Sequence, residues 1–148
     1  MSSIDMNIYA KCRKVAGFTQ ERAAELLGVG TRTLAAWESG DRVPPAIRVA
    51  DMVDLYGTPV LALQHLRINS MLTPDLIPEV TMVPLAQAVC QLASAVRNLA
   101  KSETEDRLLQ IAADGRVDEL ERPEYDELMS ELEPVIQAVL TLRCVREV

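Results

Sequence analysis

The sequence predicts an all-α protein, and three observations lead to this prediction. Apolar residues make up 49% of the 148 residues and aromatic residues only 3%, a mixture rich in alanine, leucine and valine that favours helices over strands. Apolar residues in the second half recur at alternating spacings of four and three, which places them on one face of a helix. Glycine and proline residues divide the chain where such segments stop.

Five short helices are predicted in the first half of the chain. Thr19 is well placed as an N-cap for the second, because its hydroxyl can accept a hydrogen bond from a backbone N–H of the next turn. Glycine tolerates the backbone angles of sharp reversals, so glycines are expected to end the helices, and Pro45 suits a first helical turn. The five helices are expected over residues 7–16, 20–27, 31–39, 45–56 and 59–67.

Longer amphipathic helices are predicted in the second half, where two stripes share the apolar spacing. The stripes comprise Leu85, Val89, Leu92, Val96 and Leu99, then Leu128, Leu132, Val135, Val139 and Leu142. A shorter helix around residues 108–111 is expected between them, ended by Asp114 and Gly115. Pro134 lies inside the second stripe, so that helix is expected to be kinked or split. Together these helices predict a small helical bundle or hairpin.

Charge divides the chain in the same way as the apolar pattern. Residues 1–67 carry eight basic and seven acidic side chains, a net charge of +1, whereas residues 68–148 carry seven basic and fifteen acidic ones, a net charge of −8. Pro74, Pro78 and Pro84 mark the break, with no sustained helical period between them. We therefore predict a first domain over residues 1–67, a linker over residues 68–83 and an acidic helical domain over residues 84–148.

Several classes of function have no support in the sequence. The three cysteines are far apart and, with the single histidine, offer no metal-ligand spacing, so no metal site and no cofactor are expected. No nucleophile motif, phosphate-binding glycine loop or pair of catalytic carboxylates can be recognised, so no catalytic residues are expected and the protein is expected not to be an enzyme. No apolar run reaches the roughly 18 residues that span a bilayer, and the N-terminus lacks the apolar stretch of a signal peptide, which predicts a cytoplasmic protein without membrane contact.

The most informative segment is FTQERAAELLGVGTRTLAAWESG, residues 18–40. Two short helical segments join through a glycine turn, with small apolar residues where the helices would cross, and Trp37 lies three residues after Leu34 on the expected core side. This pattern resembles the helix-turn-helix of the phage repressor and Cro superfamily, also called XRE-like, over about residues 7–66. The resemblance implies a five-helix lambda-repressor-like domain that binds double-stranded DNA as a sequence-specific transcriptional regulator.

The resemblance also implies which side chains contact DNA bases. In that family the second helix of the motif enters the major groove, and the matching positions here are Thr31, Arg32, Thr33 and Ala36. Arg32 is the strongest candidate, because a guanidinium can make a bidentate contact to guanine. Ala35 and Ala36 are short, so sequence-dependent DNA shape is expected to supply part of the specificity.

Phosphate contacts are implied at three further positions. Gln20, at the start of the preceding helix, matches a position that holds backbone phosphate, and Ser39 and Arg42 are further phosphate candidates. Arg13 and Glu38 match a supporting ion pair that forms an internal salt bridge in some relatives. A first half that is close to neutral predicts modest non-specific affinity, because that affinity follows phosphate neutralisation.

The second half is expected to bring two copies together. One helix-turn-helix contacts only a short half-site, and dimers gain specificity by covering two half-sites about one helical turn apart. Residues 84–148 are too acidic to lie easily on DNA, so we expect a homodimer or higher homo-oligomer through them, although the same stripes can also form the core of one subunit. The overall plan is similar to small regulators of phages and integrated mobile elements. Two alternatives stay open: an antitoxin-like autoregulator whose C-terminal half binds a partner protein, and a protein-interaction adaptor without DNA binding.

Overall fold

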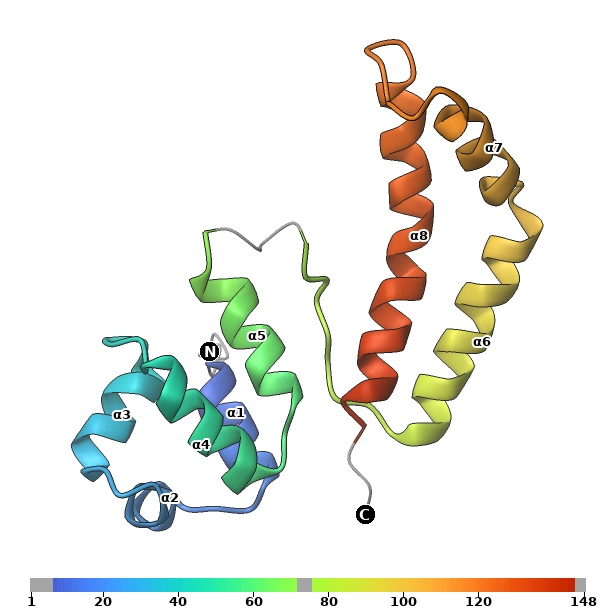
Figure 1. Ribbon diagram of the computed structural model, residues 1–148. Coiled ribbons are helices and arrows are strands. Elements are labelled where there is room, and N and C mark those ends of the chain that lie inside the picture. The colour runs from blue at the N-terminus through green and yellow to red at the C-terminus, as the bar shows by residue number, and fades with distance from the viewer. Residues whose placement is uncertain (1–6, 72–75, 146–148) are drawn as a thin grey trace, which may run out of the picture. The chain divides into compact units, whose positions relative to one another are not determined.

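The computed structural model describes residues 7–71 and 76–145, and it is built from helices (Figure 1). These described residues form eight α-helices, one 3-10 turn and no strand, so the prediction of an all-α fold is confirmed. The chain divides into two compact units, with the boundary between Glu79 and Val80. None of the helices in the described ranges is long and apolar enough to cross a membrane.

Five helices form the first unit, in the predicted order. Thr19 caps the second helix as predicted, since its hydroxyl accepts a hydrogen bond from the backbone N–H of Arg22 at 3.2 Å. Asn7 caps the first helix in the same way, accepting from Tyr9 and Ala10 at 3.1 Å. The helices are α1 (Ile8–Val15), α2 (Gln20–Leu26), α3 (Thr31–Ser39), α4 (Ala46–Tyr56) and α5 (Val60–Asn69). Helix α5 therefore takes in the first two residues of the expected linker.

The core of the first unit is formed where these helices cross. Helix α1 packs against α3 and α5, α2 packs against α3, and α4 packs against α5. Leu34, Met52, Tyr56 and Leu61 are fully buried at these crossings. Trp37 keeps only 6% of its surface exposed, so its expected place on the core side of α3 is confirmed.

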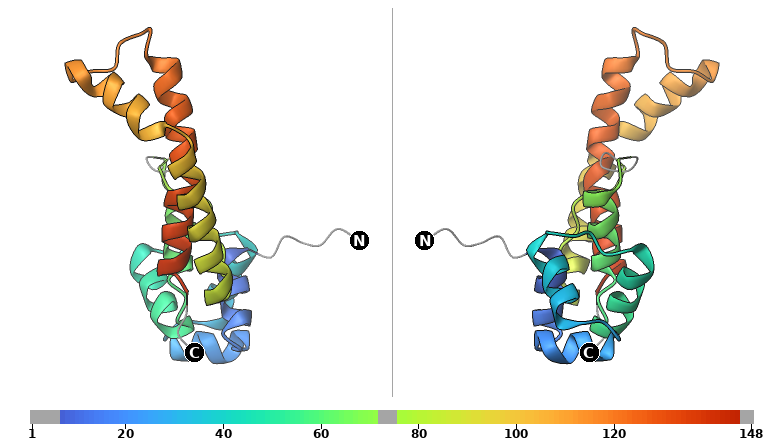
Figure 2. Two further views of the ribbon diagram at one scale, coloured as in Figure 1. Left: turned by 90° about the vertical axis from the view of Figure 1, so that its right-hand side faces the viewer. Right: turned by 90° about the vertical axis from the view of Figure 1, so that its left-hand side faces the viewer.

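Three α-helices form the second unit. They are α6 (Leu85–Lys101), α7 (Thr104–Ile111), followed by the 3-10 turn Ala112–Asp114, and α8 (Arg122–Arg143). Helices α6 and α8 run antiparallel as a hairpin, and α7 joins them at one end (Figures 1 and 2). Helix α8 continues through Pro134, so of the kink or split expected there the split does not occur. Proline costs the helix one hydrogen bond, and α8 stays helical across it while packed along α6.

The buried residues of α6 are alanines, whereas three large residues of the predicted stripe stay exposed. Ala88 is fully buried and Ala95 is 9% exposed, whereas Leu85, Val89 and Val96 keep 58%, 48% and 50% of their surfaces exposed. The apolar stripe that predicted α6 is thus only partly covered within one chain.

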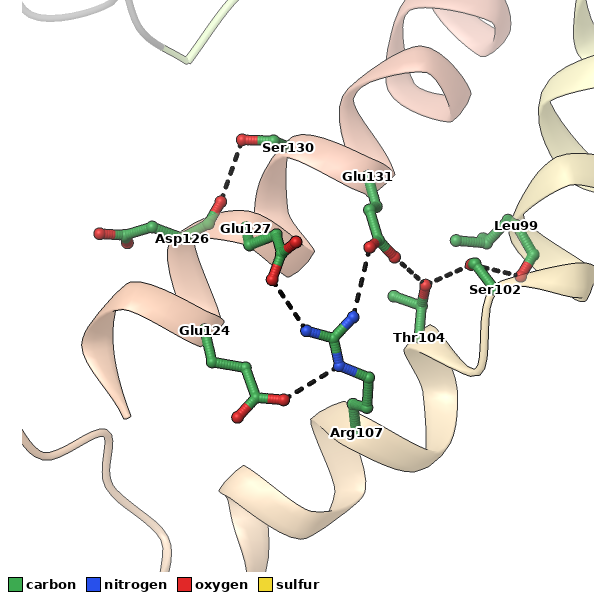
Figure 3. Close-up of polar contacts among 9 residues, drawn as sticks. All are labelled: Leu99, Ser102, Thr104, Arg107, Glu124, Asp126, Glu127, Ser130 and Glu131. Carbon is green, nitrogen blue, oxygen red and sulfur yellow. Dashed lines mark hydrogen bonds and ion pairs between the residues drawn. The ribbon is translucent and has the colours of Figure 1, made fainter. Parts of the chain in front are cut away.

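Ion pairs fasten α7 to α8 at the end of the hairpin where α7 lies (Figure 3). The Nε and Nη2 atoms of Arg107 each lie 3.0 Å from a carboxylate oxygen, of Glu124 and Glu127 respectively, and Nη1 lies 3.4 Å from Glu131. The buried hydroxyl of Thr104 donates a hydrogen bond to Glu131 as well. One guanidinium among three carboxylates leaves this end of the hairpin with an excess of negative charge.

Candidate nucleic-acid interface

The turn between α2 and α3 is built around a glycine. Gly28 has a φ of 64°, a left-handed conformation that side chains other than hydrogen disfavour. The N–H groups of Gly28 and Val29 donate to the carbonyls of Glu25 and Ala24 at 3.1 and 3.0 Å, which satisfies backbone acceptors at the end of α2. These bonds fix the direction in which the chain enters α3.

Helix α3 has one buried and one open face. Leu34 and Trp37, three residues apart, are buried toward the core of the unit. The positions expected to contact bases are more open: Thr31 and Arg32 are exposed, and Thr33 and Ala36 are half-buried. Arg32 and Ala36, one turn apart, share the open face of α3, and Thr31 and Thr33 lie at the two edges of that face.

Arg32 is the free cation of that face. Among the described residues, its guanidinium makes no hydrogen bond and no ion pair, and it stands in the first turn of α3. Arg22, on α2, differs in this respect because its Nη1 lies 2.7 Å from the carboxylate of Glu25. Arg32 can thus bind a base edge or a phosphate without first breaking an internal contact.

A buried ion pair between Arg13 and Glu38 lies within hydrogen-bond distance of Gln20, the first residue of α2. Arg13 donates from Nε and Nη2 to the two carboxylate oxygens of Glu38, at 2.6 and 2.9 Å, and from Nη1 to the Phe18 carbonyl at 2.7 Å. The side chains of Arg13 and Glu38 are only 8% and 6% exposed. Hydrogen bonding to Glu38 raises the pKa of the Arg13 guanidinium. Such charge-assisted, bidentate bonds are among the stronger ones in proteins.

Gln20 joins Arg13 and Glu38 in a network through its side-chain amide. Its Nε2 donates to Glu38 at 2.9 Å, and an amide nitrogen carries two N–H donors. The carboxylate holds one donor, and the second has no acceptor among the residues that the structure describes, so it can serve another group. Gln20 is the first residue of α2, so the network orients the side chain expected to hold phosphate.

The other two phosphate candidates have different surroundings. The Ser39 hydroxyl lies 2.7 Å from the carboxylate of Asp41 and 3.2 Å from the Ala36 carbonyl, so an acidic group stands next to it. Arg42 donates its backbone N–H to Ala36 at 3.1 Å, and its exposed guanidinium has no partner among the described residues. Arg42 is therefore the better placed of the two for a phosphate.

A buried hydroxyl in the first unit has no partner. Within the described part of the chain, the hydroxyl of Tyr56 is buried without a hydrogen bond. Burial, followed by the charge of Glu38, raises the pKa of this hydroxyl to about 12. Tyr56 is thus neutral at any ordinary pH.

Contacts that the sequence analysis did not identify hold α1 in place. The Nδ2 of Asn7 donates to the carbonyl of Trp37 at 2.5 Å, which fastens the end of α3 to α1. The Tyr9 hydroxyl lies 2.8 Å from Nδ1 of His65, which fastens α1 to α5. The preference of asparagine for N-caps is the one signal in the sequence that points to Asn7.

The comparisons with known proteins agree with this geometry. Residues 10–66 match the family model described as a helix-turn-helix domain. No curated protein and no solved structure matches the chain significantly. The matched residues extend from α1 to α5 and include every position discussed above for DNA contact. Together, the match and the fold support a helix-turn-helix DNA-binding regulator.

Proposed function

We propose that the protein is a sequence-specific transcriptional regulator of the phage repressor and Cro type, and that α3 reads the major groove of double-stranded DNA. The observation that carries this proposal is the exposed, unpartnered Arg32 in the first turn of α3, within the described residues. Ala36 lies one turn further along the same helix and leaves room for close approach to a base edge. Thr31 and Thr33 flank Arg32 and add hydroxyls, which can hydrogen-bond to donors or acceptors on base edges.

Phosphate contacts position this helix in the groove. Gln20 holds one phosphate with the N–H that Glu38 leaves free, and Arg42 holds another at the far end of α3. Ser39 is the weakest of the three, because Asp41 places a negative charge 2.7 Å from its hydroxyl. The buried pair of Arg13 and Glu38 supports the interface indirectly, by orienting Gln20.

Two copies of the chain act together on DNA, each reading one half-site in the cytoplasm. A helical, acidic second unit behind a helix-turn-helix head is the plan of small regulators in phages and integrated mobile elements, and regulation of such an element is proposed here. The excess of acidic side chains in residues 68–148 supports a role away from the DNA backbone.

A second candidate function is an antitoxin-like autoregulator, in which the second unit binds a different protein. The exposed apolar residues of α6 favour a partner of some kind for this unit. The two candidates share the DNA-binding head and differ in whether the purified protein is complete without a second gene product. A protein-interaction adaptor without DNA binding differs from both in the first experiment below.

The test is selection of bound duplexes from a random DNA pool by the full-length protein. We expect enrichment of an inverted repeat whose half-site centres lie about 10–10.5 base pairs, or a multiple of that, apart. The Arg32→Ala protein serves as the matched control and should lose enrichment at one position of each half-site. A pool that stays random after repeated rounds at low salt would exclude sequence-specific binding.

A further inference from the structure

The second unit exposes large apolar side chains that its own packing leaves uncovered. On α6 these are Leu85, Val89 and Val96, each about half exposed or more. On α8 they are Ile136 and Val139, which are 46% and 41% exposed. We call these five residues the apolar face of the hairpin. Exposed apolar residues gathered on one surface are typical of interaction sites.

Helical spacing places all five residues on the same side of the α6–α8 hairpin, the side on which Val96 lines a surface hollow. One hollow, of about 570 Å³, brings Val96 and Leu99 of α6 together with Leu132 of α8 and with α7. Ile136 and Val139 follow Leu132 at spacings of four and three, and Leu85 and Val89 precede Val96 at spacings of eleven and seven. Residues at such spacings share one face of a helix.

The opposite side of the hairpin is polar. A second hollow, of about 320 Å³, lies between the same two helices. Its polar lining includes Gln91, Ser94, Asn98, Gln137 and Thr141. The two sides of the hairpin therefore differ in chemistry, and the five large exposed apolar side chains lie on only one of them.

The apolar face also lies in the part of the second unit that has no charge. Residues 80–96 and 134–142 contain no Asp, Glu, Lys or Arg. In residues 84–145 every acidic side chain lies between Glu103 and Glu133, toward the end where Arg107 meets three glutamates (Figure 3). Depletion of charge marks the buried centre of protein interfaces. The charge pattern and the exposed apolar residues point to the same surface.

The face of the hairpin supplies a large part of the area that a stable interface between proteins needs. Helix α6 has 17 residues, about 25 Å at 1.5 Å per residue, and two packed helices present a face about 20 Å wide. The flat projection is then about 500 Å², and the accessible surface, which follows each side chain, is larger. A stable dimer buries about 800 Å² on each partner.

We infer that a second copy of this chain covers the apolar face, so that two hairpins pair as a four-helix bundle. A twofold interface places the same surface against itself, and a surface with many charges of one sign would repel its copy. The uncharged face avoids this repulsion, whereas the acidic end of the hairpin does not. The inference rests on the proposed function in that two copies are expected to act together, and it adds the surface that joins them.

The experiment is sedimentation of full-length protein without DNA over a range of concentrations. We expect a dimer for the wild type. Val89→Glu and Val96→Glu should each raise the dissociation constant of the dimer at least about a hundredfold, because each places an unpaired carboxylate in a buried apolar surface. Gln91→Glu and Ser94→Glu, on the polar side of the same helix, are the matched controls and should remain dimers.

A milder variant covers the case in which a glutamate variant fails to fold. Val89→Thr combined with Val96→Thr changes shape very little and places hydroxyls at positions that are half exposed in one chain. Helix content by circular dichroism should stay unchanged, and the dimer should weaken by about tenfold or more. A wild-type monomer, a threonine variant with wild-type dimer affinity, or polar-side controls that dissociate equally would each overturn the inference.

The same proteins separate this inference from the proposed function. Arg32→Ala should sediment as the wild-type dimer, because Arg32 lies in the first unit. A dimer that selects no DNA sequence would overturn the proposed DNA reading and leave the interface standing. A monomer that still selects a DNA sequence would overturn the interface and leave the DNA reading standing.

Discussion

The guanidinium of Arg13 holds both carboxylate oxygens of Glu38, with Nε 2.6 Å from Oε1 and Nη2 2.9 Å from Oε2. Arg13 belongs to α1 and Glu38 to the last turn of α3, and Gln20 of α2 donates to the same carboxylate. Three helices thus meet at one buried acid. Glu38 therefore joins α3, the helix expected to read DNA, to Gln20, the residue expected to hold phosphate.

Removal of this acid should destabilise the first unit strongly. In Glu38→Ala the guanidinium of Arg13 stays buried without its counter-charge, which we expect to cost about 3–5 kcal/mol of unfolding free energy. Denaturant unfolding of the full chain measures this cost. The control is Arg22→Ala, whose ion pair is exposed, with an expected cost of at most about 1 kcal/mol. Similar losses of unfolding free energy in the two variants would show that the buried ion pair stabilises the unit no more than an exposed one does.

Loss of Arg32 should weaken specific binding without unfolding the protein. Arg32→Ala removes an exposed side chain with no partner among the described residues, so stability should change by less than about 0.5 kcal/mol. Affinity for the selected DNA site should fall by about 1–3 kcal/mol. Fluorescence anisotropy at fixed salt measures the affinity. Equal affinities of mutant and wild type would remove Arg32 from the interface.

Loss of Arg42 should change how strongly DNA affinity depends on salt concentration. A phosphate contact releases counterions, so Arg42→Ala should reduce the slope of log affinity against log salt by roughly one unit, on cognate and random DNA alike. Gln20→Ala should also weaken binding to both cognate and random DNA, but it removes no charge and should leave that slope nearly unchanged. A change in base preference for either variant would contradict a phosphate role.

Tyr56→Phe should stabilise the first unit or leave its stability unchanged. The Tyr56 hydroxyl is buried with no partner in the described part of the chain, and such a group loses hydration without compensation. Its removal should leave the free energy of unfolding unchanged or raise it by up to about 1 kcal/mol. Thermal and denaturant unfolding test this expectation. A loss of more than about 1 kcal/mol would show that the hydroxyl makes a valuable hydrogen bond, for instance to water.

His65 should make stability depend on pH. Burial lowers the pKa of His65 below its ordinary value of 6.5, so the unfolded chain takes up the proton first as the pH falls. The free energy of unfolding should therefore be highest above about pH 6.5 and fall below it, with a slope of at most about 1.4 kcal/mol per pH unit, until the folded form is protonated too.

The matched variant for this test is His65→Gln. His65 is the chain's only histidine, so the substitution should flatten the stability profile between about pH 7.5 and about pH 5.5. The glutamine amide can still meet the Tyr9 hydroxyl, which lies 2.8 Å from the imidazole. An unchanged slope in His65→Gln would assign the pH dependence to other groups.

The helices of the first unit could be predicted from local signals. The cap at Thr19 and the glycines after the first four helices act within a few residues, and the predicted bounds differ from the observed ones by two residues at most. The face of α3 also followed from spacing, because Leu34 and Trp37 mark its buried side. What spacing could not show is that Arg13, Gln20 and Glu38 converge, since three separate helices bring them together.

The second unit shows why an apolar stripe is an incomplete guide. Spacing predicted α6, but it could not say which part of a broad apolar surface lies against α8. The small side chains of Ala88 and Ala95 allow the two helices to approach closely, and the larger residues beside them remain exposed. Likewise, Pro134 suggested a kink or split, whereas α8 is continuous from Arg122 to Arg143. Both outcomes depend on tertiary packing, which a single helix pattern does not contain.

The two alanines of α6 have a consequence for how such sequences diverge. Ala88 and Ala95 are the buried residues of α6, which packs on α8, and a larger side chain at either position would overpack the unit at a cost of about 1–3 kcal/mol. Among descendants of this sequence, we expect these two positions to stay small whatever the hairpin binds. Leu85, Val89 and Val96 are free of that restriction. If a second copy covers them as proposed, we expect substitutions at these three positions to be correlated with one another. Along α6, the two positions selected for small size would thus alternate with the three positions selected for the surface that they contact.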